Sequence, residues 1–263
     1  VSPGYANEIL TSEFGCGLQD FLLSRKTHIS GILNGLDRNL WNPSTDPVLP
    51  FHFDLSTISM RSKNKRALQA EVKLPMKPDT PLLIIISRMD QQKGIDIAIK
   101  GLRQCASLDW QAVILGTGDP LLETACRSLE SEFPDRVRAL IRFDAELSRR
   151  MYSAGDILLM PSRYEPCGLN QMYSLRYGTV PIVRRTGGLA DTVLNFDRAA
   201  GRGTGIVFND FDTPAMAWAF TRALTLYADT SAFVQLVQNG MAQDFSWHRQ
   251  VQRYVEQYER LAR

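Results

Sequence analysis

From Pro81 onward, short apolar runs alternate with amphipathic stretches. The apolar runs predict buried strands at 81–87, 112–116, 137–143, 156–161, 180–185 and 205–208. Between them, apolar residues three or four positions apart predict helices at 94–108, 120–133, 146–155 and 168–178. Strands and helices that alternate in this way indicate a parallel sheet covered by helices on both faces. The predicted fold class is therefore α/β, with a doubly wound, Rossmann-like sheet.

The first 80 residues follow a different pattern. A helix-like start precedes a strand-like segment at 29–37 and a proline-rich linker at 41–50. Residues 1–40 therefore indicate the remnant of a preceding domain. Residues 41–80 are expected to hold the linker and the first helix of the main domain, which extends over residues 81–245.

The chain ends in one amphipathic segment, residues 246–263. Its apolar positions recur at helical spacing and predict a helix with one apolar stripe: Val251, Tyr254, Val255, Tyr258 and Leu261. Such a stripe requires a partner surface. Because Val1 already lies in a helix-like segment, we also expect further residues upstream of it.

Composition and charge narrow the function classes. A chain of 263 residues with 44% hydrophobic residues can form a globular core. The 30 basic and 28 acidic residues give a net charge of +2 without long runs of one sign, so no nucleic-acid partner is expected. No apolar stretch reaches the ~18 residues of a membrane span, and no membrane association is expected. Four cysteines without a C-x-x-C pair favour a reducing compartment: Cys16, Cys105, Cys126 and Cys167.

Several common catalytic motifs are absent from the sequence. It contains no Walker A loop, no G-x-G-x-x-G fingerprint, no H-E-x-x-H motif and no G-x-S-x-G elbow. The three histidines, His28, His52 and His248, have no metal-ligand spacing. We therefore expect neither a metal nor another cofactor.

Basic residues and glycines follow the first two predicted strands. Arg88 closes the first strand, and Lys93 stands five positions later at the start of the next helix. Parallel strands end at the edge where α/β proteins bind ligands, and helix N-termini favour anions. Gly116 and Gly118 follow the second strand and permit either the close approach of a ligand or a tight turn. These positions outline a phosphate site, although two solvated surface cations fit the spacing equally well.

The stretch PSRYEPCGLNQ adds a carboxylate to this edge. Glu165 follows the fourth predicted strand, and the next helix begins with the unpaired amides of Gly168, Leu169 and Asn170. Amides suit a phosphate, and a nearby carboxylate suits hydroxyls or a developing positive charge, as in a nucleotide-sugar. The alternative is that Glu165 only complements the helix dipole, worth about 0.3–1 kcal/mol, and that Cys167 is a small buried hydrophobe.

Longer segments carry a family resemblance. SRMDQQKGID, GILNGLD with WNP, and SRYEPCGLNQMYSLRYGTVPIVRRTGGLADTV resemble segments of bacterial glycogen synthases and plant starch synthases, and the combined match spans nearly the whole chain. The resemblance implies the GT-B architecture, in which the active site lies between two Rossmann-like domains. This chain resembles the C-terminal, donor-binding domain, with residues 1–40 as the end of the first domain and 246–263 as the helix that crosses back to it. The K-x-G-G-L loop and active-site histidine of the family's first domain have no counterpart here, so half an enzyme is expected.

The resemblance implies a role for each matching residue. Arg88 and Lys93 match the cations on the donor diphosphate, where they would stabilise the departing ADP. Glu165 matches the acidic residue near the transferred glucose, and Cys167 its neighbour at the sugar hydroxyls. Phe143 stands where many members have a tyrosine against the adenine, so stacking is expected without a hydroxyl contact.

Further donor-binding positions follow from the same resemblance. The helix start at Gly168, Leu169 and Asn170 matches the amides that hold the distal phosphate, and Asn170 replaces the threonine of some members. The donor-binding set is completed by four glycines, of which the last two form the family's second G-G-L motif: Gly116, Gly118, Gly187 and Gly188.

The implied reaction is the transfer of glucose from ADP-glucose to the 4-hydroxyl at the non-reducing end of an α-1,4-glucan, with retention. Retention allows either a covalent carboxylate intermediate or attack from the face that the leaving group vacates. The second is favoured, because the family offers no second carboxylate of the kind that retaining glycosidases use. The expected partners are ADP-glucose, the glucan and the N-terminal domain, in a bacterial cytoplasm or a plant plastid. Two alternatives remain open: a non-catalytic nucleotide-sugar-binding module, and another retaining GT-B transferase that uses UDP-glucose.

Overall fold

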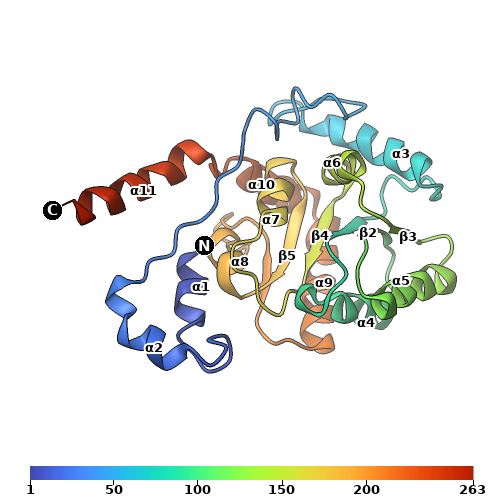
Figure 1. The fold of residues 1–263 in the computed structure, drawn as a ribbon. Coiled ribbons are helices and arrows are strands. Elements are labelled where there is room, and N and C mark those ends of the chain that lie inside the picture. The colour runs from blue at the N-terminus through green and yellow to red at the C-terminus, as the bar shows by residue number, and fades with distance from the viewer. Residues whose placement is uncertain (263) are drawn as a thin grey trace.

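The computed structural model describes residues 1–262 and is built around one parallel sheet (Figure 1). Its six strands are β1 Leu82–Ile86, β2 Gln111–Gly116, β3 Val137–Ile141, β4 Ile157–Met160, β5 Val180–Arg184 and β6 Ile206–Phe208. Their order across the sheet is β3-β2-β1-β4-β5-β6. The chain therefore builds outward from β1 to β3, returns to the middle at β4 and builds outward again. This confirms the predicted doubly wound sheet.

Helices cover both faces of the sheet (Figure 1). One layer contains α3 (Arg61–Glu71), α6 (Ala145–Ala154), α7 (Asn170–Arg176) and α10 (Thr230–Met241). The other contains α4 (Ile95–Gln104), α5 (Pro120–Glu132) and α9 (Thr213–Ala228). Outside these layers lie α1 (Pro3–Glu8), α2 (Gln19–Ser24), α8 (Gly187–Thr192) and α11 (Trp247–Leu261). Three 3-10 turns complete the fold: Lys26–His28, Ile58–Met60 and Gln91–Lys93.

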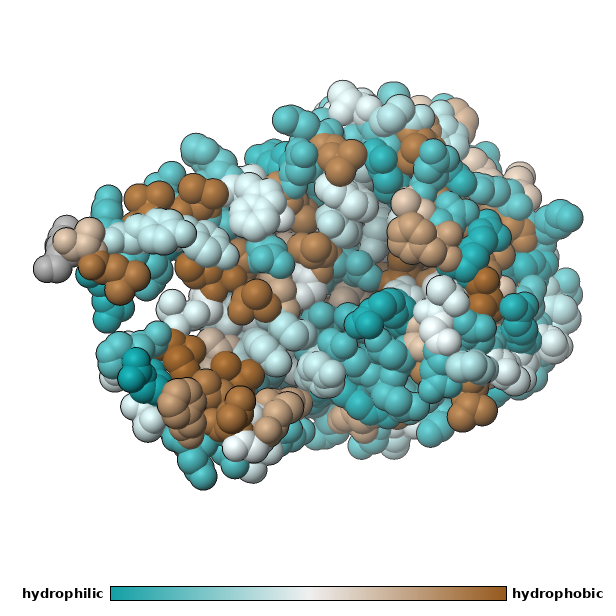
Figure 2. Space-filling view, viewed as in Figure 1, coloured by the Kyte–Doolittle hydropathy of each residue, from teal (hydrophilic) through white to brown (hydrophobic). Residues whose placement is uncertain are grey.

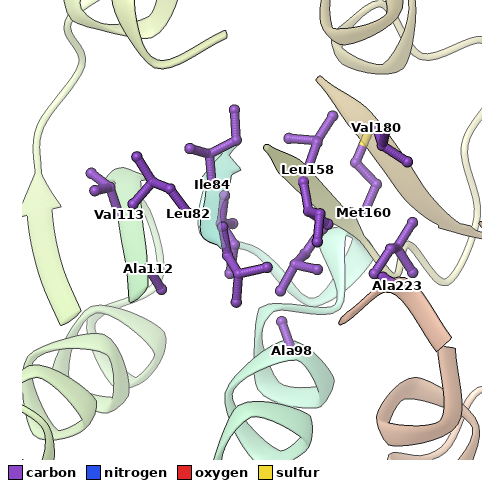
Figure 3. Packing of buried hydrophobic residues seen from close by; sticks show 14 of the residues in the cluster. Leu82, Ile84, Ala98, Ala112, Val113, Leu158, Met160, Val180 and Ala223 are labelled. Atoms are coloured by element: carbon purple, nitrogen blue, oxygen red, sulfur yellow. The ribbon is translucent and has the colours of Figure 1, made fainter. Parts of the chain in front are cut away.

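The strands form because almost all of their residues are apolar and can be buried from both sides. Leu82 and Ile84 of β1 and Leu158 of β4 are fully buried. Figure 3 shows these side chains between the layers, with Ala98 of α4 and Ala223 of α9 approaching from one face. Small residues at these helix positions let the helices pack closely on the sheet.

The predicted strands and the four predicted crossover helices are all present, but α8, α9 and α10 were not predicted. The reason is clearest for α9, whose sequence is apolar around most of its circumference. It buries residues at many successive positions, so no single stripe at 3.6-residue spacing marks it: Met216, Ala217, Ala219, Phe220, Ala223 and Leu226.

The prediction of a strand at 29–37 is wrong. This segment has no regular structure apart from one bridge between Leu36 and Ser246. A strand needs a neighbour along its length to accept and donate its backbone hydrogen bonds, and this segment has such a neighbour at one point only.

The segment predicted as a linker, residues 41–50, is packed against the body. The Asp46 side chain is buried and accepts hydrogen bonds from Arg149 of α6 at 2.8 Å and from the Tyr177 hydroxyl at 2.5 Å. Burial and the contact with Asp46 together raise the pKa of Tyr177 far above its usual value. The carboxylate therefore fastens this segment to α6 and to the end of α7.

Candidate active site

A hollow of about 350 Å³ lies at the carboxyl ends of β1, β2 and β3. Its wall contains five of the predicted site residues: Arg88, Lys93, Gly116, Phe143 and Asn170. They come from four separate segments of the sequence. The doubly wound topology brings these segments together, because the loops that follow parallel strands meet at one edge of the sheet.

Lys93 and Glu165 form an ion pair beside this hollow. The Nζ atom of Lys93 lies 2.6 Å from Oε2 of Glu165, and the two side chains are 18% and 6% exposed. The sequence predicts that Lys93 stands at the start of α4, but in the structure it lies before that helix. It ends the 3-10 turn Gln91–Lys93, whose first turn is capped by Asp90, and Gly94 then redirects the chain with φ of 67°. The predicted phosphate-binding and sugar-facing groups are therefore in direct contact.

Arg88 lies at the rim of the hollow. Its side chain is 73% exposed, and its guanidinium lies 3.2 Å from the carboxylate of Asp90. A surface pair of this kind holds its partners weakly, so Arg88 can turn toward a bound anion at little cost.

The helix start expected to bind phosphate has free donors. α7 begins at Asn170, and within residues 1–262 the amides of Gly168, Leu169 and Asn170 donate to no protein acceptor. The side chain of Asn170 is already used, because Nδ2 donates to the carbonyl of Ile86 at 2.5 Å and ties α7 to β1. What Asn170 offers a ligand is therefore its backbone amide. Gly178, with φ of 75°, follows the end of α7 and lets the chain leave the helix.

Cys167 does not line the hollow. It packs in a small cluster with Leu33, Leu36 and Met172, and its sulfur accepts a hydrogen bond from the amide of Asn34 at 3.4 Å. Burial raises the pKa of its thiol. In this arrangement Cys167 joins the N-terminal segment to the turn that carries Glu165.

Gly187 and Gly188 also lie outside the hollow and support the Glu165 turn from behind. The amide of Gly188 donates to the carbonyl of Glu165 at 2.9 Å. A Cβ atom on Gly188 would stand 2.0 Å from the carbonyl oxygen of Cys167, and one on Gly187 would stand 2.1 Å from that of Glu165. Only glycine permits this approach, so the second G-G-L motif holds the turn in place.

The glycines after β2 have a related role. Gly116 lines the hollow, and a Cβ atom there would lie 1.9 Å from the carbonyl of Ser87. Gly118 lies outside it, packed on the carbonyl of Met89, and its amide donates to Glu123 at 2.9 Å. Both residues allow the loops after β1 and β2 to run side by side.

Sequence reasoning missed the aromatic wall of the hollow. Trp41 stacks on Tyr173 with ring centroids 3.5 Å apart and an interplanar angle of 16°, and Tyr152 packs edge-on against Trp41. The sequence pattern places Trp41 in a linker, and the two tyrosines resemble core positions of amphipathic helices. A signal for the two tyrosines was present in the sequence, because the helices that carry them, α6 and α7, both begin at the ligand-binding edge of the sheet. Phe143, at 86% exposure, stands at the mouth between Arg142 and Asp144.

Within residues 1–262, no three histidine, cysteine, aspartate or glutamate side chains gather so that they could hold a metal ion. No helix in that range has the length and apolar character needed to cross a membrane.

Comparison with known sequences gives a consistent assignment. Residues 68–239 match the family described as glycosyl transferases group 1. Over 262 residues the chain is 45% identical to a glycogen synthase of Streptococcus sanguinis and 49% identical to one of Anaeromyxobacter dehalogenans. The alignments cover 99% and 100% of the chain but 55% of each relative, so the chain spans about half the length of the curated relatives it matches.

Comparison with solved structures agrees. The chain is similar to the catalytic domain of Starch Synthase IV from Arabidopsis thaliana, bound to ADP and acarbose, with a TM-score of 0.93 and 36% identity over 99% of the chain and 54% of that protein. It shares its fold with HepE of Anabaena in complex with UDP and glucose, with a TM-score of 0.68 and 19% identity over 94% of the chain and 61% of that protein. The predicted resemblance to bacterial glycogen synthases and plant starch synthases is confirmed.

Proposed function

Because the chain belongs to the glycosyl transferases group 1, we propose that it is the donor-binding part of a glycogen or starch synthase. It binds ADP-glucose and contributes to glucose transfer, with retention, onto the non-reducing end of an α-1,4-glucan. The observation that carries the proposal is the convergence of Lys93, Glu165 and the free amides at the start of α7. Sequence identity of 45–49% to glycogen synthases supports the choice of donor and acceptor.

The leaving diphosphate meets fixed positive charge in this arrangement. Lys93 and Arg88 offset the charge that builds up on ADP, and the amides from Gly168 to Asn170 bind its distal phosphate. Lys93 and the amides are already in place and only the exposed Arg88 has to turn, so little reorganisation accompanies the reaction. No metal ion is required for this role.

Glu165 faces the sugar in the same proposal. Its carboxylate orients the transferred glucose and stabilises the positive charge that develops at the anomeric carbon. Low exposure strengthens this interaction, because water screens it weakly. Lys93 links the two halves of the reaction, since it contacts Glu165 and lies on the wall of the phosphate site.

In this proposal, the aromatic residues at the mouth of the hollow bind the adenine base. Phe143 presents an exposed ring on which adenine can stack, and the stacked pair of Trp41 and Tyr173 forms the inner wall. If UDP-glucose displaces bound ADP-glucose in a competition titration, the donor assignment is wrong and the UDP-dependent alternative holds.

The N-terminal segment and α11 meet the rest of the enzyme in this proposal. Figure 2 shows apolar side chains gathered over α2 and along α11, including exposed Phe21 and Leu23 of α2 and Val255 and Leu261 of α11. We assign residues 1–40 and α11 to contacts with an N-terminal domain that supplies the acceptor side of the cleft. The bacterial relatives favour a cytoplasmic location.

Titration of the 263-residue chain with ADP tests the phosphate site. Lys93→Ala is expected to weaken binding about tenfold, because it removes a charge-assisted contact. Lys100→Ala is the matched control, since Lys100 is an exposed lysine on the adjacent helix α4. Equal effects of the two substitutions would contradict the site.

Glucan extension tests the role of Glu165. This chain alone is expected to show none. Joined to an N-terminal domain, it should transfer glucose, and Glu165→Gln should abolish transfer while ADP affinity changes less than about threefold. A parallel loss of transfer and ADP affinity would show that Glu165 serves binding and not the reaction.

A further inference from the structure

A hollow of about 760 Å³ lies at the opposite edge of the sheet from the candidate active site. Pro81, which precedes β1, and Asp156, which precedes β4, are in its wall, so it lies at the amino ends of these strands. We call it the amino-edge hollow. It is bordered by α3, by the end of α9 and by the start of α10. Its volume falls in the range of small-molecule sites, about 300–1,000 Å³.

Apolar side chains form much of the wall of the amino-edge hollow. Tyr227 and Phe233 pack edge to face, with ring centroids 5.0 Å apart and an interplanar angle of 72°. Leu224, Val234 and Val237 continue the apolar surface along α9 and α10. Val234 is 38% exposed, so part of this surface meets water in the free protein. Its burial by an apolar ligand would be favourable.

Two buried cations of α3 also line the amino-edge hollow, and one of them is fully used. The Nζ atom of Lys65 lies 2.7 Å from the carboxylate of Asp156. It also contacts the carbonyls of Thr80 at 2.6 Å and Pro78 at 3.0 Å and the Tyr227 hydroxyl at 3.0 Å. An ammonium has three N–H groups, so Lys65 has no donor left for a ligand. This ion pair serves the fold, because it holds α3 against the starts of β1 and β4.

Arg61 is the other buried cation, and part of its guanidinium is unused. It is 8% exposed and lines the hollow. Its Nε donates to the carbonyl of Tyr177 at 2.9 Å, and its Nη2 donates to the carbonyl of Gly155 and to the Thr179 hydroxyl. Among residues 1–262, Nη1 has no acceptor and no carboxylate pairs with Arg61. Two N–H groups of a buried cation therefore remain for a ligand.

A buried cation without a counter-ion is unfavourable. Burial lowers the pKa of Arg61, and the carboxylate of Asp156 acts in the opposite direction, although its ion pair is with Lys65. An anionic group on Nη1 would supply the missing negative charge. Water screens such a contact weakly at a buried position, so it is stronger than a surface ion pair.

The rim of the hollow limits the charge of the ligand. Asp79 and Asp109 line it and are exposed. Lys77 lies 3.7 Å from Asp109 and offsets its charge, whereas Asp79 pairs with no cation in the described range 1–262. Asp79 repels a doubly charged ion more strongly than a singly charged one, and Arg61 offers one free nitrogen only. A carboxylate therefore suits the hollow better than a phosphate.

We propose that the amino-edge hollow binds a small monocarboxylate with an apolar body. The carboxylate accepts hydrogen bonds from Nη1 of Arg61, and the apolar body covers the wall that α9 and α10 form. The inference goes beyond the proposed function and does not depend on it, because the two hollows lie at opposite edges of the sheet and share no lining residue.

Titration of the 263-residue chain with octanoate, followed by ligand-observed NMR, tests the site. Octanamide has the same chain without the charge and is expected to bind about tenfold more weakly, because it lacks the charge-assisted contact. Arg61→Gln should weaken octanoate binding by about the same factor. Circular dichroism melts report whether each variant is folded.

A second variant tests the wall, because Arg61 also supports the fold. Val234→Glu places a negative charge on the apolar surface and is expected to weaken octanoate binding at least about tenfold. Val251→Glu is the matched control, because Val251 is an exposed valine on α11 outside the hollow. The control should leave octanoate binding unchanged.

The other outcomes would overturn the inference. Equal binding of octanoate and octanamide would show an apolar cleft without an anion site. Displacement of octanoate by ADP would place it in the candidate active site, and displacement by inorganic phosphate would show a general anion site. Absence of octanoate binding, or a dimer of the chain that Val234→Glu dissociates, would also contradict it. Octanoate binding as expected in a chain that fails to bind ADP would contradict the proposed function alone.

Discussion

At the scale of single residues, Lys93 and Glu165 each depend on the other. Both side chains lie largely out of water, and desolvation of two charges is repaid only by a close contact such as their 2.6 Å separation. In the free protein, the attraction between the two charges therefore offsets the cost of removing them from water. A bound diphosphate gives Lys93 a second partner, and the transferred sugar gives Glu165 one.

Substitution of Glu165 should lower the free energy of unfolding by an amount that depends on the new side chain. Glu165→Ala leaves the Lys93 charge without a partner and is expected to lower the free energy of unfolding by about 3–5 kcal/mol. Glu165→Gln keeps an oxygen that can accept from Lys93 and should cost clearly less. Urea denaturation of the two variants makes the comparison. Equal losses would mean that the side chain is held by packing and not by Lys93.

The cysteines should differ sharply in reactivity. Cys16 is exposed, whereas Cys105, Cys126 and Cys167 are buried. Burial raises the pKa of Cys126 to about 12 and raises that of Cys167, so both stay as unreactive thiols near neutral pH. Treatment with iodoacetamide, read by peptide mass spectrometry, should label Cys16 first. Early labelling of Cys167 would show that its contact with the N-terminal segment opens readily.

At the scale of elements, the Glu165 turn is held between α7 and α8. Gln171 of α7, whose side chain is fully buried, donates from Nε2 to the carbonyl of Cys167 at 3.0 Å and to Thr192 of α8 at 3.1 Å. Gly188 adds the backbone contact to Glu165 from the other side. The turn is rigid because two helices fix its backbone, which is how a site on a loop keeps its geometry.

Gly188→Ala should disturb this support. The added methyl group would lie 2.0 Å from the carbonyl of Cys167, so the turn must shift. We expect a loss of about 1–3 kcal/mol in stability and weaker ADP binding. Gly17→Ala is the control, because a Cβ atom there meets nothing within 4 Å and only its φ of 83° is strained. The control should lose some stability and no ADP affinity, and an unchanged ADP affinity in Gly188→Ala would argue against the support.

The N-terminus of α6 should contribute to stability in a pH-dependent way. Burial raises the pKa of Asp144, but its hydrogen bond from the Leu147 amide and the guanidinium of Arg142 outweigh this, and its net pKa is lowered. A lowered carboxyl pKa adds stability above the unfolded value of about 3.9, and that stability is lost as the pH falls through the folded value.

Asp144→Asn isolates this charge, because asparagine also caps helices well. The variant should be about 0.5–1 kcal/mol less stable than the parent near neutral pH, and the difference should shrink and then disappear as the pH falls through the lowered pKa of Asp144 in the folded protein. Thermal melts at a series of pH values measure it. A difference that persists in acid would assign the effect to packing.

At the scale of the whole molecule, α11 projects from the body (Figure 1). Among its described residues only Gln250 is buried, while Val251, Val255 and Tyr258 are 40–68% exposed. At the start of α11, the carbonyl of Leu36 accepts a hydrogen bond from the Trp247 amide, and the Leu36 amide donates to the carbonyl of Phe245 at 2.7 Å. The connection to the body therefore lies at the beginning of the helix and not along its length.

Two truncations should separate the contribution of most of α11 to stability from that of the contacts around its start. Removal of residues 251–263 is expected to change the melting temperature by less than about 2 °C, because few contacts are lost. Removal of residues 245–263 should lower it by more than about 4 °C, since it takes away the bridge at Leu36 and the packing of Phe245 near Cys167. A large effect of the shorter truncation would show that α11 folds back on the body in solution.

Local pattern was enough to predict the sheet and its ligand-binding edge. Strands β1 to β5 have four to six residues, almost all of them apolar, and β6 is shorter. Burial on both faces leaves such runs few other conformations. The order of strands and crossovers then places Arg88, Lys93 and Glu165 at one edge, whatever the details of packing.

Contacts between distant segments could not be predicted in this way. The pairing of Lys93 with Glu165, 72 positions apart, and the stacking of Trp41 on Tyr173 depend on how loops and helices pack against each other. The same holds for the glycines of the second G-G-L motif, whose close approach to the Glu165 turn is a property of two backbones together. Sequence periodicity reports the environment of one element at a time, whereas these contacts arise only when several elements share one volume.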